Sequence, residues 1–179
     1  FIALIPALVE QERDWRTRNS VQSFVEREGE AHLIGQTNLS AKADRIDRLR
    51  EGGWAVIDYK TGTIPSTKDM AEGRKVQLTL EASILNAGGF KGIQGTARSL
   101  VYRRLAKDMN TSILDQDVET TAQFVLDRLR GLVASYLEAG RSYPSCPYGF
   151  KQDFLPPAAR EYDHLARVLE WSGVEEDAA

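Results

Sequence analysis

The chain has 179 residues, of which 42% are hydrophobic and 27% are charged. This length suits one domain with a sizeable core, and the composition is that of a globular protein rather than of a disordered or membrane protein. The formal net charge of −3 argues against a domain that grips nucleic acid through a broad basic surface.

Hydrophobic periodicity predicts a helix, three strands, a helix, a strand and two further helices. Their expected bounds are, in that order, 3–17, 21–33, 39–49, 54–59, 76–86, 96–104, 117–139 and 158–171. This order predicts a mixed α/β domain with an antiparallel hairpin at its centre. The second helix should end at Gly88-Gly89, and the apolar stripe of the helix at 117–139 should pack in the core. We expect one domain, with a core of about residues 1–140 and a C-terminal extension of about 141–179.

Cysteine and histidine are scarce. One cysteine, Cys146, cannot form an intramolecular disulfide, and with His32 and His164 far apart in sequence it cannot build a Cys/His zinc site. Any metal should therefore be held mainly by carboxylates. The opening segment has no basic leader and is too short to span a bilayer, so we interpret it as a helix inside a fragment of a longer protein and expect a cytoplasmic location.

The strand expected at 54–59 leads into a carboxylate and an ammonium on one face. Residues two apart share a face of a strand, so Asp58 and Lys60 project to the same side. A bare D-x-K pattern is usually a surface ion pair. Here the strand is apolar from Trp54 to Ile57, and burying a charged group in such a strand costs free energy unless a partner or a metal compensates the charge. This context favours a functional site.

Two registers are open for the hairpin that contains this strand. A three-residue loop at Arg50–Gly52 is a common connection, and it places Asp44 opposite Asp58. A two-residue loop at Gly52-Gly53 places Asp47 opposite Asp58 instead. Opposed carboxylates about 4 to 6 Å apart are unfavourable unless a cation lies between them. The first register therefore predicts a site for Mg²⁺ or Mn²⁺, which prefer carboxylate oxygen and water.

The segment around this hairpin resembles the PD-(D/E)xK nuclease superfamily. The pattern is A-x-A-D-R-I-D, a glycine turn, V-I-D-Y-K-T-G and then Q-L-x-L-E-A at a helix start, and it is densest over residues 41–85. More narrowly, it is similar to the C-terminal nuclease domain of RecB-like and AddB-type subunits of bacterial double-strand-break repair helicase–nucleases. Residues 162–167 also resemble the ends of AddB chains. The resemblance implies a restriction-endonuclease-like core.

The resemblance further implies a Mg²⁺- or Mn²⁺-dependent deoxyribonuclease of exonuclease type. It assigns catalysis to Asp44, Asp58, Lys60 and Gln77, and metal ligation to Asp44, Asp58 and the Tyr59 carbonyl. It also implies a glutamate on the first helix, for which Glu10 and Glu12 are both candidates. Many relatives have a tyrosine one helical turn after the glutamine, where this chain has Glu81.

Partners and competing functions follow from the same resemblance. We expect single-stranded DNA, fed by an AddA-type motor subunit, and no iron–sulfur cluster, because some relatives use four cysteines for it and this chain has one. Two basic clusters supply the expected DNA contacts, Arg45 and Arg48 in one and Arg103 and Arg104 in the other. Either cluster taken alone is more typical of a solvated mixed-charge face. The alternatives are a catalytically silent DNA-binding domain and a stand-alone structure-specific endonuclease. A P-loop NTPase is disfavoured, because neither GGFKGIQGT nor YKTGT has the required spacing.

Overall fold

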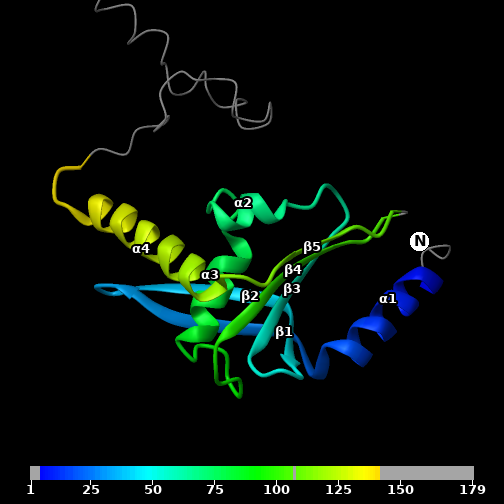
Figure 1. Cartoon of the computed structure of the whole chain (residues 1–179). Helices are drawn as coiled ribbons and strands as arrows, with labels where there is room; N and C mark the ends of the chain where they lie inside the picture. Colours follow the sequence, from blue (N-terminus) through cyan, green and yellow to red (C-terminus); the bar gives the residue numbers. More distant parts are fainter. Residues whose placement is uncertain (1–4, 107, 142–179) are drawn as a thin grey trace, which may run out of the picture. The chain divides into compact units, whose positions relative to one another are not determined.

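The computed structural model describes residues 5–106 and 108–141 (Figure 1). Its elements are α1 (Ile5–Arg18), β1 (Ser20–Ile34), β2 (Thr37–Leu49), β3 (Trp54–Lys60), α2 (Thr67–Ala71), α3 (Gln77–Asn86), β4 (Ala97–Arg104), β5 (Thr111–Leu114) and α4 (Val118–Leu137). The strands form one sheet in the order β1-β2-β3-β4-β5. β3 and β4 pair in parallel and the other neighbours pair antiparallel. The predicted mixed α/β class is therefore confirmed.

Contacts divide the chain into two units, Phe1–Ser135 and Tyr136–Ala179. The first unit contains the whole described sheet. Of the second, only residues 136–141 are described, so the expected helix at 158–171 and the C-terminal extension lie outside the described residues. The single-domain organisation stays a prediction. Within the described ranges, no helix combines the length and the apolar character that crossing a membrane requires.

Helices lie on both faces of the sheet. Successive residues of a strand point to opposite faces, and alternate residues of β3 accordingly belong to two separate apolar clusters. On one face Val56 packs with the fully buried Leu78 and Leu85 of α3. On the other face Ile57 packs against Trp15 of α1. β3 is therefore buried from both sides, which explains its continuous apolar run.

α3 ends where the sequence predicts. Gly88 adopts a positive φ of 73°, and its N–H and that of Gly89 donate to the carbonyls of Leu85 and Ile84, which closes the helix in a Schellman motif. Gly89 is also required for a close approach, because a Cβ there would overlap the carbonyl oxygen of Glu30 on β1. The loop after α3 is thereby fixed against the β1–β2 hairpin.

Three features differ from the sequence prediction. α2 and β5 were not predicted, because a five-residue helix and a four-residue strand are too short to show a period. α2 nevertheless begins at a capping box made by Ser66 and Asp69, which is a readable signal. The stripe of α4 is only partly core: Val118 and Val125 are buried, but Leu132 is 54% exposed.

The connection from β3 to β4 positions the first residue of α3. Parallel strands need a crossover that returns the chain to the same end of the sheet. Here α2 and α3 supply it, and α3 contacts β2, β3 and β4. Gln77, the first residue of α3, consequently lies beside the C-terminal end of β3, where it hydrogen-bonds Asp58.

Candidate functional site

The hairpin adopts the register that opposes two carboxylates. Asp47 of β2 pairs with Ala55 of β3, and the same register continued along the strands places Asp44 opposite Asp58. The three-residue loop at Arg50–Gly52 is therefore confirmed. The competing register, with Asp47 opposite Asp58, is wrong.

Asp44 is held against the backbone of β3. The last residue of β2 that pairs with β3 on this side is Arg45. One residue earlier, Oδ2 of Asp44 accepts the N–H of Tyr59 at 3.0 Å, where an unbroken ladder would offer a backbone carbonyl. The Asp44 carboxylate is thus fixed beside the residue whose carbonyl is an expected metal ligand.

Asp58, Lys60 and Gln77 form a closed hydrogen-bonded triangle. Nζ of Lys60 lies 3.0 Å from both carboxylate oxygens of Asp58 and donates to Oε1 of Gln77 at 2.9 Å. Nε2 of Gln77 donates to Oδ1 of Asp58 at 2.7 Å. Asp58 is 3% exposed, whereas the Lys60 side chain is 36% exposed. The buried carboxylate therefore holds an ammonium that still reaches solvent.

Glu81 extends this cluster one turn further along α3. Nε2 of Gln77 lies 3.2 Å from its Oε1, and the residue is 3% exposed. Burial, together with the charges of Asp58 and Asp44, raises the pKa of Glu81 to about 7. Burial also raises the pKa of Asp58, although Lys60 opposes this. Negative charge is therefore concentrated here at a cost that a cation would relieve.

Tyr102 of β4 joins the cluster without having been predicted. It lies opposite Asp58 in the parallel register, and its ring centre is 5.7 Å from Nζ of Lys60. Burial raises its pKa to about 12. No sequence signal identifies it, because its place depends on the β3–β4 pairing that the crossover sets.

The donor atoms at this site fit a hard divalent cation. Oε2 of Glu81 is buried and accepts no hydrogen bond, and the buried Oδ2 of Asp58 has the ion pair with Lys60 but accepts no hydrogen bond of good geometry. With Asp44 they form an oxygen-only, negatively charged donor set, which suits Mg²⁺ or Mn²⁺. In the described part of the chain no three His, Cys, Asp or Glu side chains are already arranged as a metal site. Lys60 lies among the carboxylates in this arrangement, so a cation would share their charge with its ammonium.

Comparison with known families agrees with this geometry. Residues 3–150 match the family model described as the PD-(D/E)XK nuclease superfamily. The chain belongs to this superfamily. Membership supports nuclease activity and the use of a divalent metal, and the five-stranded mixed sheet flanked by helices is consistent with its restriction-endonuclease-like fold.

The chain is similar in sequence to uncharacterised proteins of Rickettsia conorii, Rickettsia felis and Rickettsia typhi. Each is 36% identical over 78 residues, which is 42% of this chain and 9% of the relative. The chain thus matches a small part of much longer proteins. The crystal structure of SSO0001 superposes with a TM-score of 0.41 at 15% identity, over 83% of this chain and 66% of that chain.

The N-terminal glutamates lie away from the Asp58 cluster of this PD-(D/E)XK chain. Glu10 is exposed on α1. Glu12 pairs with Arg45 at 2.7 Å and with Arg103 at 2.8 Å. These contacts lie on the α1 face of the sheet, opposite the face that carries Asp58. The structure therefore brings neither candidate to the predicted site.

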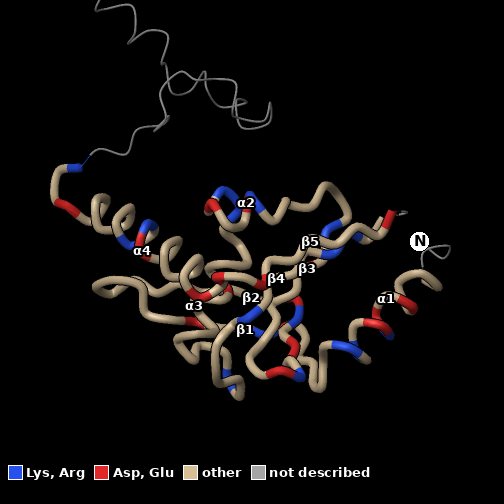
Figure 2. Tube along the Cα trace, viewed as in Figure 1, with Lys and Arg blue, Asp and Glu red and all other residues tan. Residues whose placement is uncertain are grey.

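Two of the four arginines expected at DNA are structural. Arg45 and Arg103 are 4% and 2% exposed. Arg45 also pairs with Asp47 at 2.6 Å, and the guanidinium of Arg103 lies 4.9 Å from the ring centre of Trp15. Burial and neutralisation remove both from the surface, which corrects that expectation. Arg48 is exposed, and Arg104 pairs with Asp108. Figure 2 shows basic and acidic positions intermixed along the trace.

Proposed function

We propose that this domain hydrolyses phosphodiester bonds of DNA with Mg²⁺ or Mn²⁺. The observation that carries the proposal is the Lys60 ammonium, held by Asp58 and Gln77 beside Asp44 at the end of β3. Membership of the nuclease superfamily supports the same reaction class.

Each residue has a separate task in this proposal. Asp44, Asp58 and the Tyr59 carbonyl would hold the cation, which when bound lowers the pKa of a water and stabilises charge on the scissile phosphate. Lys60 cannot be a ligand while protonated, so it orients the attacking water and offsets charge on the phosphate. Gln77 fixes the positions of Lys60 and Asp58 through one hydrogen bond to each.

Calorimetry with Mn²⁺ and cleavage of labelled single-stranded DNA test this function. The parent should bind Mn²⁺ and cleave only when a divalent cation is added, and Asp58→Asn should lose both properties. Asp127→Asn is the matched control, because that carboxylate is 57% exposed on α4. Asp58→Asn that binds Mn²⁺ as tightly as the parent would place the metal elsewhere. A parent that binds metal and DNA without cleaving would be the silent DNA-binding domain.

We further propose that the domain acts as the exonuclease of an AddB-type subunit in the cytoplasm, where an AddA-type motor feeds it single strands. The motifs over residues 41–85 support this, as does the match to a small part of much longer relatives. The test is degradation of linear duplex DNA by the intact complex. Asp58→Asn should abolish degradation but leave ATP-driven unwinding. Rapid cleavage of flap DNA without a motor would indicate a stand-alone structure-specific endonuclease instead.

A further inference from the structure

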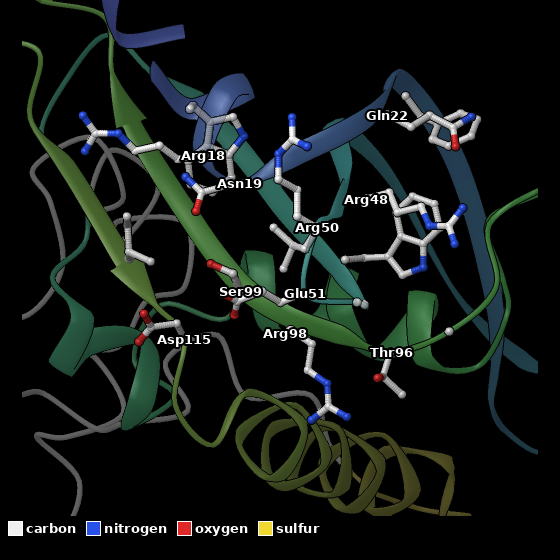
Figure 3. Close-up of a pocket in the computed structure, with 18 of the residues that line it drawn as sticks. Arg18, Asn19, Gln22, Arg48, Arg50, Glu51, Thr96, Arg98, Ser99 and Asp115 are labelled. Carbon is white, nitrogen blue, oxygen red and sulfur yellow. The ribbon is translucent and has the colours of Figure 1, made fainter. Parts of the chain in front are cut away.

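A large groove surrounds the β2–β3 turn, at the opposite end of β3 from Asp58 and Lys60. Its volume is about 1350 Å³, and Trp54, the first residue of β3, lines it. Figure 3 shows its walls, which come from the end of α1, the end of β2, the turn itself and the start of β4. None of the predicted catalytic residues lines this groove.

Positive charge gathers in the groove although the chain is acidic overall. Four arginines line it against two carboxylates, Glu51 and Asp115, whereas the whole chain has a net charge of −3. The arginines come from different elements and are Arg18, Arg48, Arg50 and Arg98. An excess of guanidinium in one hollow of an acidic protein indicates an anionic ligand.

The two arginines at the ends of β2 and β4 are not engaged by the protein. Arg48 and Arg98 are exposed and form neither an ion pair nor a hydrogen bond with any described residue. Arg50 donates to the carbonyl of Arg16 at 3.3 Å, and Arg18 pairs with Asp14 at 3.2 Å. These guanidiniums therefore have donors available for a ligand, unlike the buried Arg45 and Arg103.

Glycines in the groove wall leave its backbone accessible. Gly52 and Gly92 line the groove, and a Cβ at either position would meet no atom within 4 Å. Their φ values of 93° and 80° favour glycine, so side chains are kept out of this space. An extended ligand can consequently approach the backbone between the arginines.

The spread of the arginines fits a polymer rather than a small anion. A single phosphate needs donors that converge on one point, whereas these come from the end of α1, from the end of β2 with the turn that follows it, and from the start of β4. β3 has seven residues, which at about 3.3 Å each span roughly 20 Å. The end of β3 that carries Asp58 and Lys60 therefore lies roughly 20 Å from the turn, which is too far for one phosphate to reach both places.

We propose that this groove binds the phosphate backbone of a DNA strand roughly 20 Å from the bond that the Asp58–Lys60 site cleaves. The distance to the cleaved bond rests on the proposed function, whereas the binding of DNA in the groove does not. The groove acts as a remote anchor, so long substrates bind better than short ones while chemistry at Lys60 is unchanged.

The test compares Arg48→Ala/Arg98→Ala with the matched double variant Arg13→Ala/Arg128→Ala, whose arginines are exposed outside the groove. Fluorescence anisotropy measures binding of labelled oligothymidylates about 5 and about 20 nucleotides long over a range of NaCl concentrations, with Ca²⁺ present to prevent cleavage. The groove variant should bind the long probe roughly tenfold more weakly at low salt. Its plot of log binding constant against log salt concentration should be shallower by about 1.4, because two contacts at about 0.7 each are lost. The parent should bind the short probe more weakly than the long one, and binding of Mn²⁺ by the groove variant should stay at the parental level.

Several results would overturn the groove assignment. Parental affinity and salt slope for the long probe in the groove variant would do so, and so would an equal loss in the control variant, which would reflect net charge alone. Parental cleavage that depends on Asp58, combined with normal binding by the groove variant, would leave the nuclease function standing and remove the groove. If the parent never cleaves DNA but the groove variant still loses binding of the long probe, the groove assignment stands and the nuclease function is refuted.

Discussion

Lys60 is positioned by residues from three elements at once. Its ammonium donates to Asp58 on its own strand and to Gln77 at the start of α3, and it lies over the ring of Tyr102 on β4. Fixed donors of this kind need little reorganisation when charge develops on a substrate. The side chain keeps 36% of its surface exposed, so substrate can reach it.

Lys60→Ala should separate chemistry from metal binding. Loss of one preorganised charge should lower the rate of single-strand cleavage about 10²- to 10³-fold. Affinity for Mn²⁺ should hold or rise, because the variant removes a positive group and no ligand. Cleavage is measured in the intact complex and metal affinity by calorimetry on the domain, with the exposed Lys68→Ala as the control. Undiminished cleavage would refute the assignment, and loss of folding would make Lys60 a structural ion-pair partner.

Glu81 should make stability depend on pH in the metal-free protein. Burial raises its pKa from 4.5 to about 7, so the folded state holds a proton that the unfolded state releases. This contribution is complete below pH 4.5 and is lost as the pH rises through about 7. The shift corresponds to about 3 kcal/mol at most.

Urea unfolding of the parent and of Glu81→Gln in EDTA tests this contribution. The uncharged amide keeps the shape of the side chain but does not titrate between pH 5 and 8. The variant should therefore gain stability relative to the parent as the pH rises across this range. A constant difference between the two proteins would show that Glu81 ionises at an ordinary pKa.

The sequence predicted the carboxylate and lysine positions but not the fate of every charge. Alternation along β3 was enough to place Asp58 and Lys60 on one face, and the helix-start motif placed Gln77 beside them. The same alternation cannot show which helix covers the other face. Arg45 and Arg103 therefore looked available for DNA, whereas Glu12 and Trp15 of α1 bury them.

At the scale of elements, the loop length of one hairpin decides which aspartate belongs to the site. The sequence left two registers open, and the positive φ of Gly52, 93°, fits the third position of the three-residue loop that the structure adopts. This loop places Asp44 on the face that carries Asp58 and Asp47 on the α1 face. There the carboxylate of Asp47 accepts hydrogen bonds from Arg45 at 2.6 Å and from Trp15 at 2.7 Å.

Substitution of Asp47 should lower the stability of the fold, whereas substitution of Asp44 should weaken metal binding. Asp47 is 0% exposed and is the partner of a buried guanidinium, so Asp47→Ala should destabilise the fold by about 3 to 5 kcal/mol. Asp44→Asn should cost about 1 kcal/mol or less in stability but should weaken Mn²⁺ binding. Urea unfolding and calorimetry on both variants provide the check. If the Asp47→Ala variant is stable but no longer binds Mn²⁺, the metal site belongs to Asp47 and not to Asp44.

The contribution of Asp47 to stability is lost at low pH. Burial alone would raise its pKa, but hydrogen bonds from Arg45 and Trp15 outweigh burial and lower it. A depressed pKa adds stability above the unfolded value, near 3.8, and this is lost as the pH falls through the folded value. Acid should therefore loosen the contact between α1 and the sheet, an element-level weakness that periodicity does not reveal.

At the scale of the molecule, positive charge is concentrated locally rather than spread over the surface. The net charge is −3, two of the four arginines expected at DNA are buried, and the groove holds four arginines against two carboxylates. Composition alone predicted the first fact. The other two depend on which side chains the fold turns inward, and sequence periodicity does not determine that for charged residues on strands covered from both sides.

This distribution predicts that the domain alone binds single-stranded DNA weakly and with strong dependence on salt. Nonspecific contacts of this type have dissociation constants of roughly 10⁻⁴ to 10⁻⁶ M at physiological salt. If all four groove arginines neutralise phosphates, a single strand should show a log–log salt slope of about −3, at about 0.7 per contact. Anisotropy titrations of a labelled oligothymidylate from low to physiological salt measure both quantities. Asp115→Asn should raise affinity, because it removes a like charge beside the phosphates, whereas Asp127→Asn outside the groove should not. Nanomolar affinity at physiological salt would contradict this distribution of charge, and it would mean that the domain needs no motor subunit to retain its substrate.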